Sequence, residues 1–350
     1  MMRRAATSSR LAATLLLAAV AASGACKEAA SGAAGEGGAM NALYGGGSGA
    51  AGAQRRTDQA PTLSYVEDLS ARAERNFESR LPTGELLRFH EVVQADGQGR
   101  LRADVVEVWD EATQSWIPPH PLLEGLYAQR TSFILRLRDL HLHARGLLAN
   151  YRWEPLAGTV DVDGRTCAVT RAHSLHGLGP IDLVHELGSG LLLGWTVWDV
   201  SGTQMLQRLT TTDLELQPNQ NGVIWVDDRL PEETYDANVH DAELGFTPRA
   251  LDYAPTGFYR EKAVVEDLRA FPSPVDFVHL EYWSDGLRTL YVMQHAAVTG
   301  NGAPGGISFA RMSREGGVVA IESDAADRRI AAIGLLPVDD VLMVVGALHE

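Results

Sequence analysis

The chain has 350 residues, of which 45% are hydrophobic and 21% charged, so it carries enough apolar material for a folded core and is not wholly disordered. Lysine and arginine number 30 against 45 aspartates and glutamates, a formal charge of −15. This acidic balance argues against a nucleic-acid-binding protein, which normally carries a basic excess. With two cysteines, a disulfide framework and a four-cysteine zinc site are excluded.

Residues 1–26 have the layout of an export signal. Arg3, Arg4 and Arg10 precede an apolar run over 11–22, and the small residues S-G-A then lead to Cys26. The run is shorter than the roughly 20 residues that a membrane-spanning helix needs, which favours a signal peptide. A cysteine directly after small residues is typical of a bacterial lipoprotein, in which Cys26 would be lipidated. The alternative is an ordinary cleaved signal with an incidental cysteine.

Residues 27–60 form a Gly/Ala-rich segment that cannot bury enough apolar surface to offset its chain entropy. We expect a flexible tether between a lipid anchor and the folded part.

The first folded unit is predicted over 61–220. Apolar residues at helical spacing predict a helix over 62–80, and two alternating segments around Gly97 and Gly99 predict a hairpin of strands over 85–94 and 101–109. A second helix is predicted over 121–141, since it begins with proline and has an apolar stripe. The stripe consists of Leu122, Leu126, Phe133, Leu137 and Leu140.

Short strands joined by tight turns follow the second predicted helix. They are expected over 151–156, 160–162, 165–173, 181–186, 191–200 and 204–216. Consecutive strands with turns of two to four residues indicate an antiparallel meander rather than βαβ units.

A linker is predicted over 221–254 and a smaller α+β domain over 255–350. Strands of this second unit are expected over 257–268, 277–283, 288–294, 318–322 and 329–333. A closing helix is predicted over 337–348, with Pro337 in its first turn and Val341, Val344, Val345 and Leu348 facing inward.

Motifs of known enzymes are weak in this chain. His185 and Glu186 begin like a zinc-protease motif, but no second histidine follows at helical spacing. Neither a nucleophile elbow nor a phosphate-binding lysine loop is present in the sequence. Cys167 is expected to be a buried thiol. We therefore expect a protein that is not an enzyme and that uses no metal or cofactor.

Three stretches of the chain carry turn motifs in a fixed order. They are the turn at Gly164 and Arg165, the L-V-H-E-L-G-S-G-L-L-L-G-W run, and the turn of Ser284, Asp285, Gly286 and Leu287. Together they resemble the RseB/MucB family of periplasmic sigma-factor regulators, in which similar motifs form two hairpins of the first domain and one of the last. The motifs stand in the family's order over about 80–348. The chain departs from the usual member in its predicted lipid anchor and in its middle strand, where Leu183–Glu186 replace the expected Trp and Asp.

The resemblance implies an α+β fold, with a LolA-like open antiparallel half-barrel packed on helices and a small C-terminal domain. It also implies a periplasmic protein that binds the periplasmic part of a transmembrane anti-sigma factor, shields that factor from proteolysis and responds to lipid-like signals. An acyl chain would enter an apolar cavity of the half-barrel. The predicted lining is Leu122, Leu126, Phe133, Leu137, Trp153, Trp195 and Trp198.

Two other functions stay open at this point. A LolA/LolB-type carrier or lipid-binding envelope lipoprotein would keep the cavity without a sigma-factor role. An envelope hydrolase of unrecognised type would need reactive side chains that no motif reveals.

Overall fold

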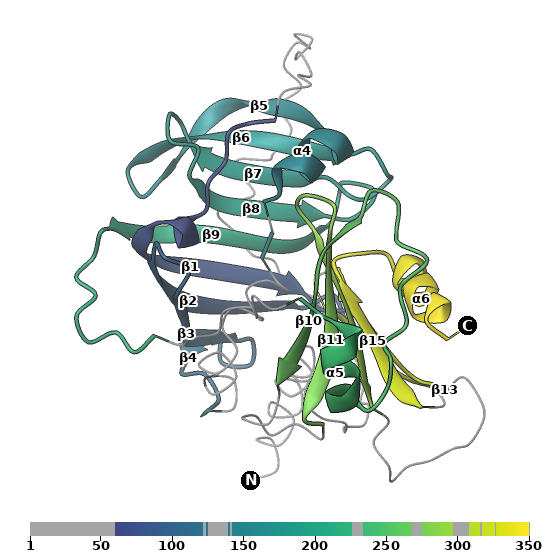
Figure 1. Ribbon diagram of the computed structural model, residues 1–350. Helices are drawn as coiled ribbons and strands as arrows, with labels where there is room; N and C mark the ends of the chain where they lie inside the picture. Colours follow the sequence, from purple (N-terminus) through teal and green to yellow (C-terminus); the bar gives the residue numbers. More distant parts are fainter. Residues whose placement is uncertain are drawn as a thin grey trace.

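The structure is a computed structural model of the chain. It describes residues 60–121, 124, 139, 140, 142–225, 234–267, 275–296, 308–315, 317–325 and 327–349. Within these ranges the chain forms two antiparallel sheets and a few short helices, and the strands of one sheet run across the direction of the other (Figure 1). Cys26 lies outside the described residues.

The first sheet has nine strands. Their bounds are β1 Ser70–Arg80, β2 Leu86–Asp96, β3 Leu101–Asp110, β4 Ser115–Ile117, β5 Tyr151–Val162, β6 Arg165–Ser174, β7 Ile181–Glu186, β8 Leu192–Trp198 and β9 Met205–Leu216. The order across the sheet is β4-β3-β2-β1-β9-β8-β7-β6-β5. Its edge strands β4 and β5 do not pair with each other, so the sheet stays open. The predicted α+β fold with an open antiparallel sheet is confirmed.

The helix predicted over 62–80 is wrong. Only a 3-10 turn, η1 (Val66–Asp68), precedes β1, and from Ser70 to Arg80 burial alternates with a period of two. The buried positions include Ala73, Phe77 and Ser79. β1 pairs with β2 on one side and β9 on the other, so its backbone groups are satisfied within the sheet. These pairings override the helical spacing of a few apolar side chains.

The hairpin and the meander are confirmed with shifted ends. β2 and β3 flank a turn in which Gly97 and Gly99 have positive φ. The two strands predicted over 151–156 and 160–162 are one strand, β5, with an irregularity between Pro155 and Thr159. A proline and a bulge both interrupt pairing, which is suited to an edge strand.

The second sheet has six described strands. Their bounds are β10 Tyr259–Asp267, β11 Phe277–Ser284, β12 Thr289–Ala296, β13 Ser308–Glu315, β14 Val318–Asp324 and β15 Arg328–Gly334, in the order β10-β11-β12-β15-β14-β13. The sequence did not predict β13. It did not predict α5 (Ala237–Leu244) either, which begins at the capping side chain of Asp236 and ends at Gly245 in a left-handed conformation.

Both faces of the second sheet are buried. Leu290 and Val292 of β12 pack in one cluster with Val341 and Val344 of α6 (Val338–Ala347), which confirms the predicted closing helix. Alternate residues such as Tyr291 belong to a second cluster, which the first sheet shares. Because both faces are covered, β11, β12, β14 and β15 are buried at most of their positions instead of at alternate ones.

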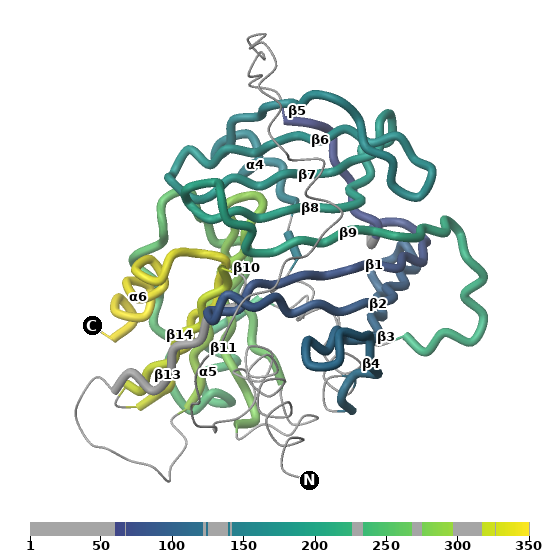
Figure 2. The backbone as a smooth tube through the Cα atoms, turned by 180° about the vertical axis from the view of Figure 1, so that it is seen from behind, coloured from purple at the N-terminus to yellow at the C-terminus, as the bar shows by residue number. Residues whose placement is uncertain are grey.

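The shared cluster joins the two sheets into one body. It contains Phe77 and Trp195 of the first sheet and Leu280 and Ile333 of the second. Seen from behind, β10 to β15 lie against the middle of the nine-stranded sheet, and α6 lies on their outer side (Figure 2). The second unit therefore covers part of the apolar face that the open first sheet would otherwise leave to solvent.

The helix predicted over 121–141, with Leu122, Leu126, Phe133 and Leu137, lies almost wholly outside the described residues. The two described residues at its predicted end, Asp139 and Leu140, are not helical. A short helix, α4 (Ala144–Asn150), follows and runs directly into β5. Gly146 of α4 lies against the backbone of the turn between β11 and β12.

Candidate functional site: the junction and groove between the sheets

The turn between β11 and β12 is buried although most of its side chains are polar. Ser284, Asp285, Leu287 and Arg288 are at most 3% exposed. The Asp285 carboxylate accepts hydrogen bonds from the backbone N–H of Leu287 at 2.9 Å and of Arg288 at 2.8 Å. The turn thus holds its own shape through the aspartate, a residue favoured in turns for this local bonding.

The same turn is bonded to the first unit. The other Asp285 carboxylate oxygen accepts from the Tyr151 hydroxyl at 2.6 Å, and Arg288 donates to that hydroxyl at 2.8 Å. The Asn150 side-chain amide donates to the carbonyls of Asp285 at 2.7 Å and Gly257 at 2.8 Å. Every one of these contacts joins residues more than a hundred positions apart, so the network is a property of the tertiary fold.

Burial raises the pKa of Tyr151 well above its usual value, and the Asp285 carboxylate beside it acts in the same direction. The hydroxyl therefore stays protonated and donates a hydrogen bond to the Asp285 carboxylate. Arg288 is also bonded to the Gly179 carbonyl, so its charge is satisfied from two sides. Buried polar groups with complete partners of this kind specify one arrangement of the parts they join.

Gly286 allows the close approach of the turn to α4. Its φ is +111°, and a Cβ at this position would lie 2.5 Å from the backbone of Gly146 and Leu147. The Gly286 carbonyl accepts from the backbone N–H of His143 at 3.1 Å. Because Gly146 and Gly286 both lack a side chain, the backbones of α4 and of the turn can lie in contact, and a side chain at either position would push them apart.

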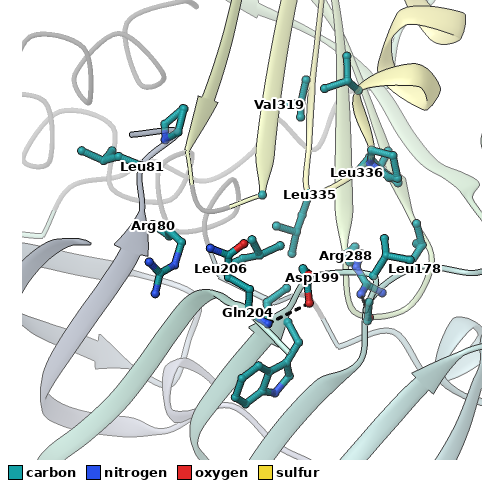
Figure 3. A pocket seen from close by; sticks show the side chains of 18 of the residues that line it. Arg80, Leu81, Leu178, Asp199, Gln204, Leu206, Arg288, Val319, Leu335 and Leu336 are labelled. Carbon is teal, nitrogen blue, oxygen red and sulfur yellow. Dashed lines mark hydrogen bonds between the residues drawn. The ribbon is translucent and has the colours of Figure 1, made fainter. Parts of the chain in front are cut away.

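A groove of about 440 Å³ lies beside this junction, and both sheets line it. The first unit contributes Arg80, Leu81, Trp198 and Leu206. The second sheet and the segment after it contribute residues that include Val319, Leu335 and Leu336. Figure 3 shows Arg80 and Arg288 on opposite sides of the groove, with Leu206 and Leu335 between them. Pockets that bind small molecules commonly have this size and are mostly apolar with a few polar groups.

The predicted cavity tryptophans do not share one wall. Trp153 and Trp195 are 1% and 2% exposed and belong to the core that joins the sheets. Trp198 lines the groove, and its indole N–H donates to Asp182 at 2.8 Å. The remaining predicted cavity residues, Leu122, Leu126, Phe133 and Leu137, lie outside the described residues.

The predicted turn motifs fall at two separate places. Gly164 has a φ of +70° in the β5–β6 turn, and Arg165 pairs with Glu186 at 3.0 Å. Neither residue of this turn lines the groove. The Ser284–Leu287 turn is at the junction. The sequence therefore pointed to the junction turn but not to its partners Asn150 and Tyr151, nor to Arg80, for which no local pattern stands out.

No group of three or more potential metal ligands gathers in the described part of the chain. Cys167 is buried, as expected, and burial raises the pKa of its thiol to about 11. Among the described helices, none is long and apolar enough to cross a membrane.

Comparison with known proteins finds similar solved structures. Neither a protein-family model nor a curated protein sequence matches this chain. The chain is similar to MucB. A crystal structure of MucB covers 80% of this chain and 92% of its own, at 16% identity and a TM-score of 0.49. A structure of MucB in complex with MucA(peri) covers 81% and 93%, at 17% identity and a TM-score of 0.47.

A putative outer membrane lipoprotein-sorting protein domain from Vibrio parahaemolyticus covers 45% of this chain and 88% of its own, at 9% identity and a TM-score of 0.19. At such identities and TM-scores a likeness describes the arrangement of the chain and does not carry a function across.

Proposed function

We propose that the protein is a non-enzymatic regulator of the bacterial envelope. It binds the periplasmic part of a transmembrane anti-sigma factor and limits the proteolysis of that factor, and a lipid-like ligand controls the binding. We further propose that it is exported to the periplasm and anchored through lipid on Cys26. The order of the RseB/MucB-like motifs along both units supports the regulator role.

The groove shared by the two sheets carries the proposal. A ligand in it touches β1, β8 and β9 of the first sheet together with β14 of the second. Any change in how the two sheets sit would therefore change the affinity for the ligand, and by linkage the ligand favours one arrangement of the sheets. A partner that binds across both units senses the same arrangement. This is the coupling that a ligand-controlled binding protein needs.

Net charge supports the choice of a basic partner segment. The formal charge of −15 favours the encounter with an arginine-rich segment and disfavours acidic surfaces. Long-range attraction of this kind acts mainly on the association rate and weakens with salt.

A carrier of lipoproteins or lipids, similar to LolA or LolB, is the second candidate. The open sheet with an apolar interior favours it, because such a surface suits acyl chains. A carrier has no need of a partner platform in the second unit. The two candidates therefore differ in whether a protein partner is bound.

The test is a pull-down from envelope membranes with the full exported chain, tether included, followed by binding of the purified anti-sigma periplasmic domain. We expect one transmembrane anti-sigma factor to be captured and its proteolysis to slow in the presence of the protein. A chain with Gly164→Ala, a substitution away from the junction turn, should capture the anti-sigma factor as well as the wild-type chain does. Recovery of lipid without any anti-sigma factor would reject the regulator and favour the carrier.

A further inference from the structure

Arg80 differs from the other arginines of the first sheet. Most of those pair with a carboxylate: Arg72, Arg75, Arg88, Arg100, Arg102, Arg165, Arg171 and Arg208. Arg80 instead donates to two backbone carbonyls, Met205 at 2.9 Å and Gly84 at 2.8 Å. Among the described residues no carboxylate forms an ion pair with it. The carbonyl of Gly84 in the turn after β1 and that of Met205 at the start of β9 hold its guanidinium in place, and no described carboxylate neutralises its charge.

The other charged groups of the groove are already satisfied. Arg288 is buried and bonded to Tyr151 and Gly179, and it lies 3.5 Å from the Asp285 carboxylate. Asp199 accepts from the backbone N–H groups of Thr203 and Gln204 and from the Ser201 hydroxyl. Burial raises the pKa of the Asp199 carboxyl, but the hydrogen bonds from its own turn together outweigh burial and hold that pKa below its usual value. Arg80 is thus the charge in the groove that is left for a ligand.

The rest of the lining is apolar. Leu81, Trp198 and Leu206 come from the first unit, and Val319, Leu335 and Leu336 come from the second (Figure 3). A half-buried guanidinium beside such a wall matches a molecule with one anionic end and one hydrocarbon chain. Guanidinium groups bind carboxylates and phosphates through two parallel hydrogen bonds, and burial of each CH₂ of the chain adds to the affinity.

We propose that this groove binds a single-chain anionic amphiphile, with its carboxylate or phosphate on Arg80 and its chain along the apolar wall formed by both sheets. The inference rests on the proposed function, since it names the class of the lipid-like ligand and its place. It puts the ligand between the two units rather than under the 121–141 segment. The bound chain bridges the sheets beside the Asp285 turn and so stabilises their present arrangement.

The experiment measures binding of laurate, lauryl phosphate and neutral lauryl alcohol to the full exported chain, below their micelle concentrations, by calorimetry or native mass spectrometry. Four proteins are compared: wild type, Arg80→Gln, Arg80→Lys and Arg152→Gln. Arg152 is exposed on β5 and does not line the groove, so it is the matched control for loss of one positive charge. Circular dichroism confirms that each variant is folded.

We expect wild type to bind laurate and lauryl phosphate about 10- to 100-fold more tightly than lauryl alcohol, the range expected for a hydrogen-bonded charge. Arg80→Gln should remove that preference and leave the alcohol affinity unchanged, Arg80→Lys should keep part of it, and Arg152→Gln should keep all of it. A phosphate preference over carboxylate points to a phospholipid-derived ligand, and the reverse points to a free fatty acid. Both results support the site.

Equal behaviour of Arg80→Gln and Arg152→Gln would overturn the site, as would equal affinity of wild type for laurate and lauryl alcohol. The comparison of ligands on wild type does not depend on how well a variant folds. Binding of the anti-sigma periplasmic domain is measured separately in ligand-free protein. If the partner binds through Arg80 while laurate does not bind, the groove is a binding site for the partner and the proposed amphiphile site is refuted. If laurate binds at Arg80 without any partner binding, the site stands and the regulator role fails.

Discussion

The contact between Gly286 and α4 gives the sharpest test of the junction. Gly286→Ala adds one methyl group at a φ of +111°, where it meets the backbone of Gly146 and Leu147 at 2.5 Å. The positive φ alone costs about 1 kcal/mol for a residue with a Cβ. Because the obstacle is main chain and not a flexible side chain, the helix must move, which costs about 1–3 kcal/mol more. We expect a total loss of about 2–4 kcal/mol.

Two matched variants separate the strain from the clash. Gly164→Ala places a methyl group at a φ of +70° with nothing within 4 Å, so it should cost only the strain of about 1 kcal/mol. Gly146→Ala is the reverse case, since Gly146 lies in helix α4 and its Cβ would meet the Asp285 carbonyl. It should cost the clash without the strain.

The assay is urea unfolding followed by tryptophan fluorescence and circular dichroism, together with affinity for the anti-sigma periplasmic domain. A loss of 2–4 kcal/mol is a large share of the roughly 5–15 kcal/mol that stabilises a typical domain. We expect partner affinity to fall with Gly286→Ala and Gly146→Ala but not with Gly164→Ala. If Gly286→Ala and Gly164→Ala lower the unfolding free energy equally, α4 does not constrain the turn and the reasoning fails.

Three further predictions follow from single residues. Arg75→Met should lower the unfolding free energy by about 3–5 kcal/mol, because Glu91 is fully buried and loses its cation at 2.7 Å. Arg72→Met, at a partly exposed pair, should lower it by at most about 1 kcal/mol in the same denaturation assay. Equal losses in the two variants would contradict this prediction. Burial and nearby Arg260 lower the pKa of His279 to about 4 from 6.5, so the unfolded state binds the proton first and stability falls as pH drops through 6.5 toward 4. Between pH 7 and pH 5 this amounts to about 2 kcal/mol, and a His279→Gln chain whose stability falls as steeply as wild type would refute it. Cys26→Ser should move the protein from membranes to the soluble envelope fraction, whereas retention in membranes, or no acyl group on Cys26 by mass spectrometry, would reject the anchor.

Patterns read over a few residues determined most strands. In the meander from Tyr151 to Leu216, side chains alternate between buried and exposed over short stretches, and tight turns such as that at Gly164 need only local backbone freedom. α6 could also be predicted, because its apolar residues repeat at helical spacing and Pro337 marks its start. In these elements local preference and tertiary environment agree.

β1 shows where local patterns are insufficient. Its apolar residues fit a helix about as well as a strand, and the choice depends on hydrogen bonds to β2 and β9. Phe77 is opposite Phe89 on one side and Leu209 on the other, and the second of these partners is far along the chain. A strand in the centre of a sheet gains its stability from such partners, which no short window of sequence contains.

The functional site divides in the same way. The run from Ser284 to Leu287 announced a tight turn, since Asp285 and Gly286 favour one by local bonding and positive φ. That the turn is buried against α4, bonded to Asn150 and Tyr151, was decided only when the two sheets packed together. The place of Arg80 at the groove was decided there too. A charge becomes available to a ligand through what surrounds it in space, and the surroundings of Arg80 include Met205 and residues of the second sheet, all more than a hundred positions away in the sequence.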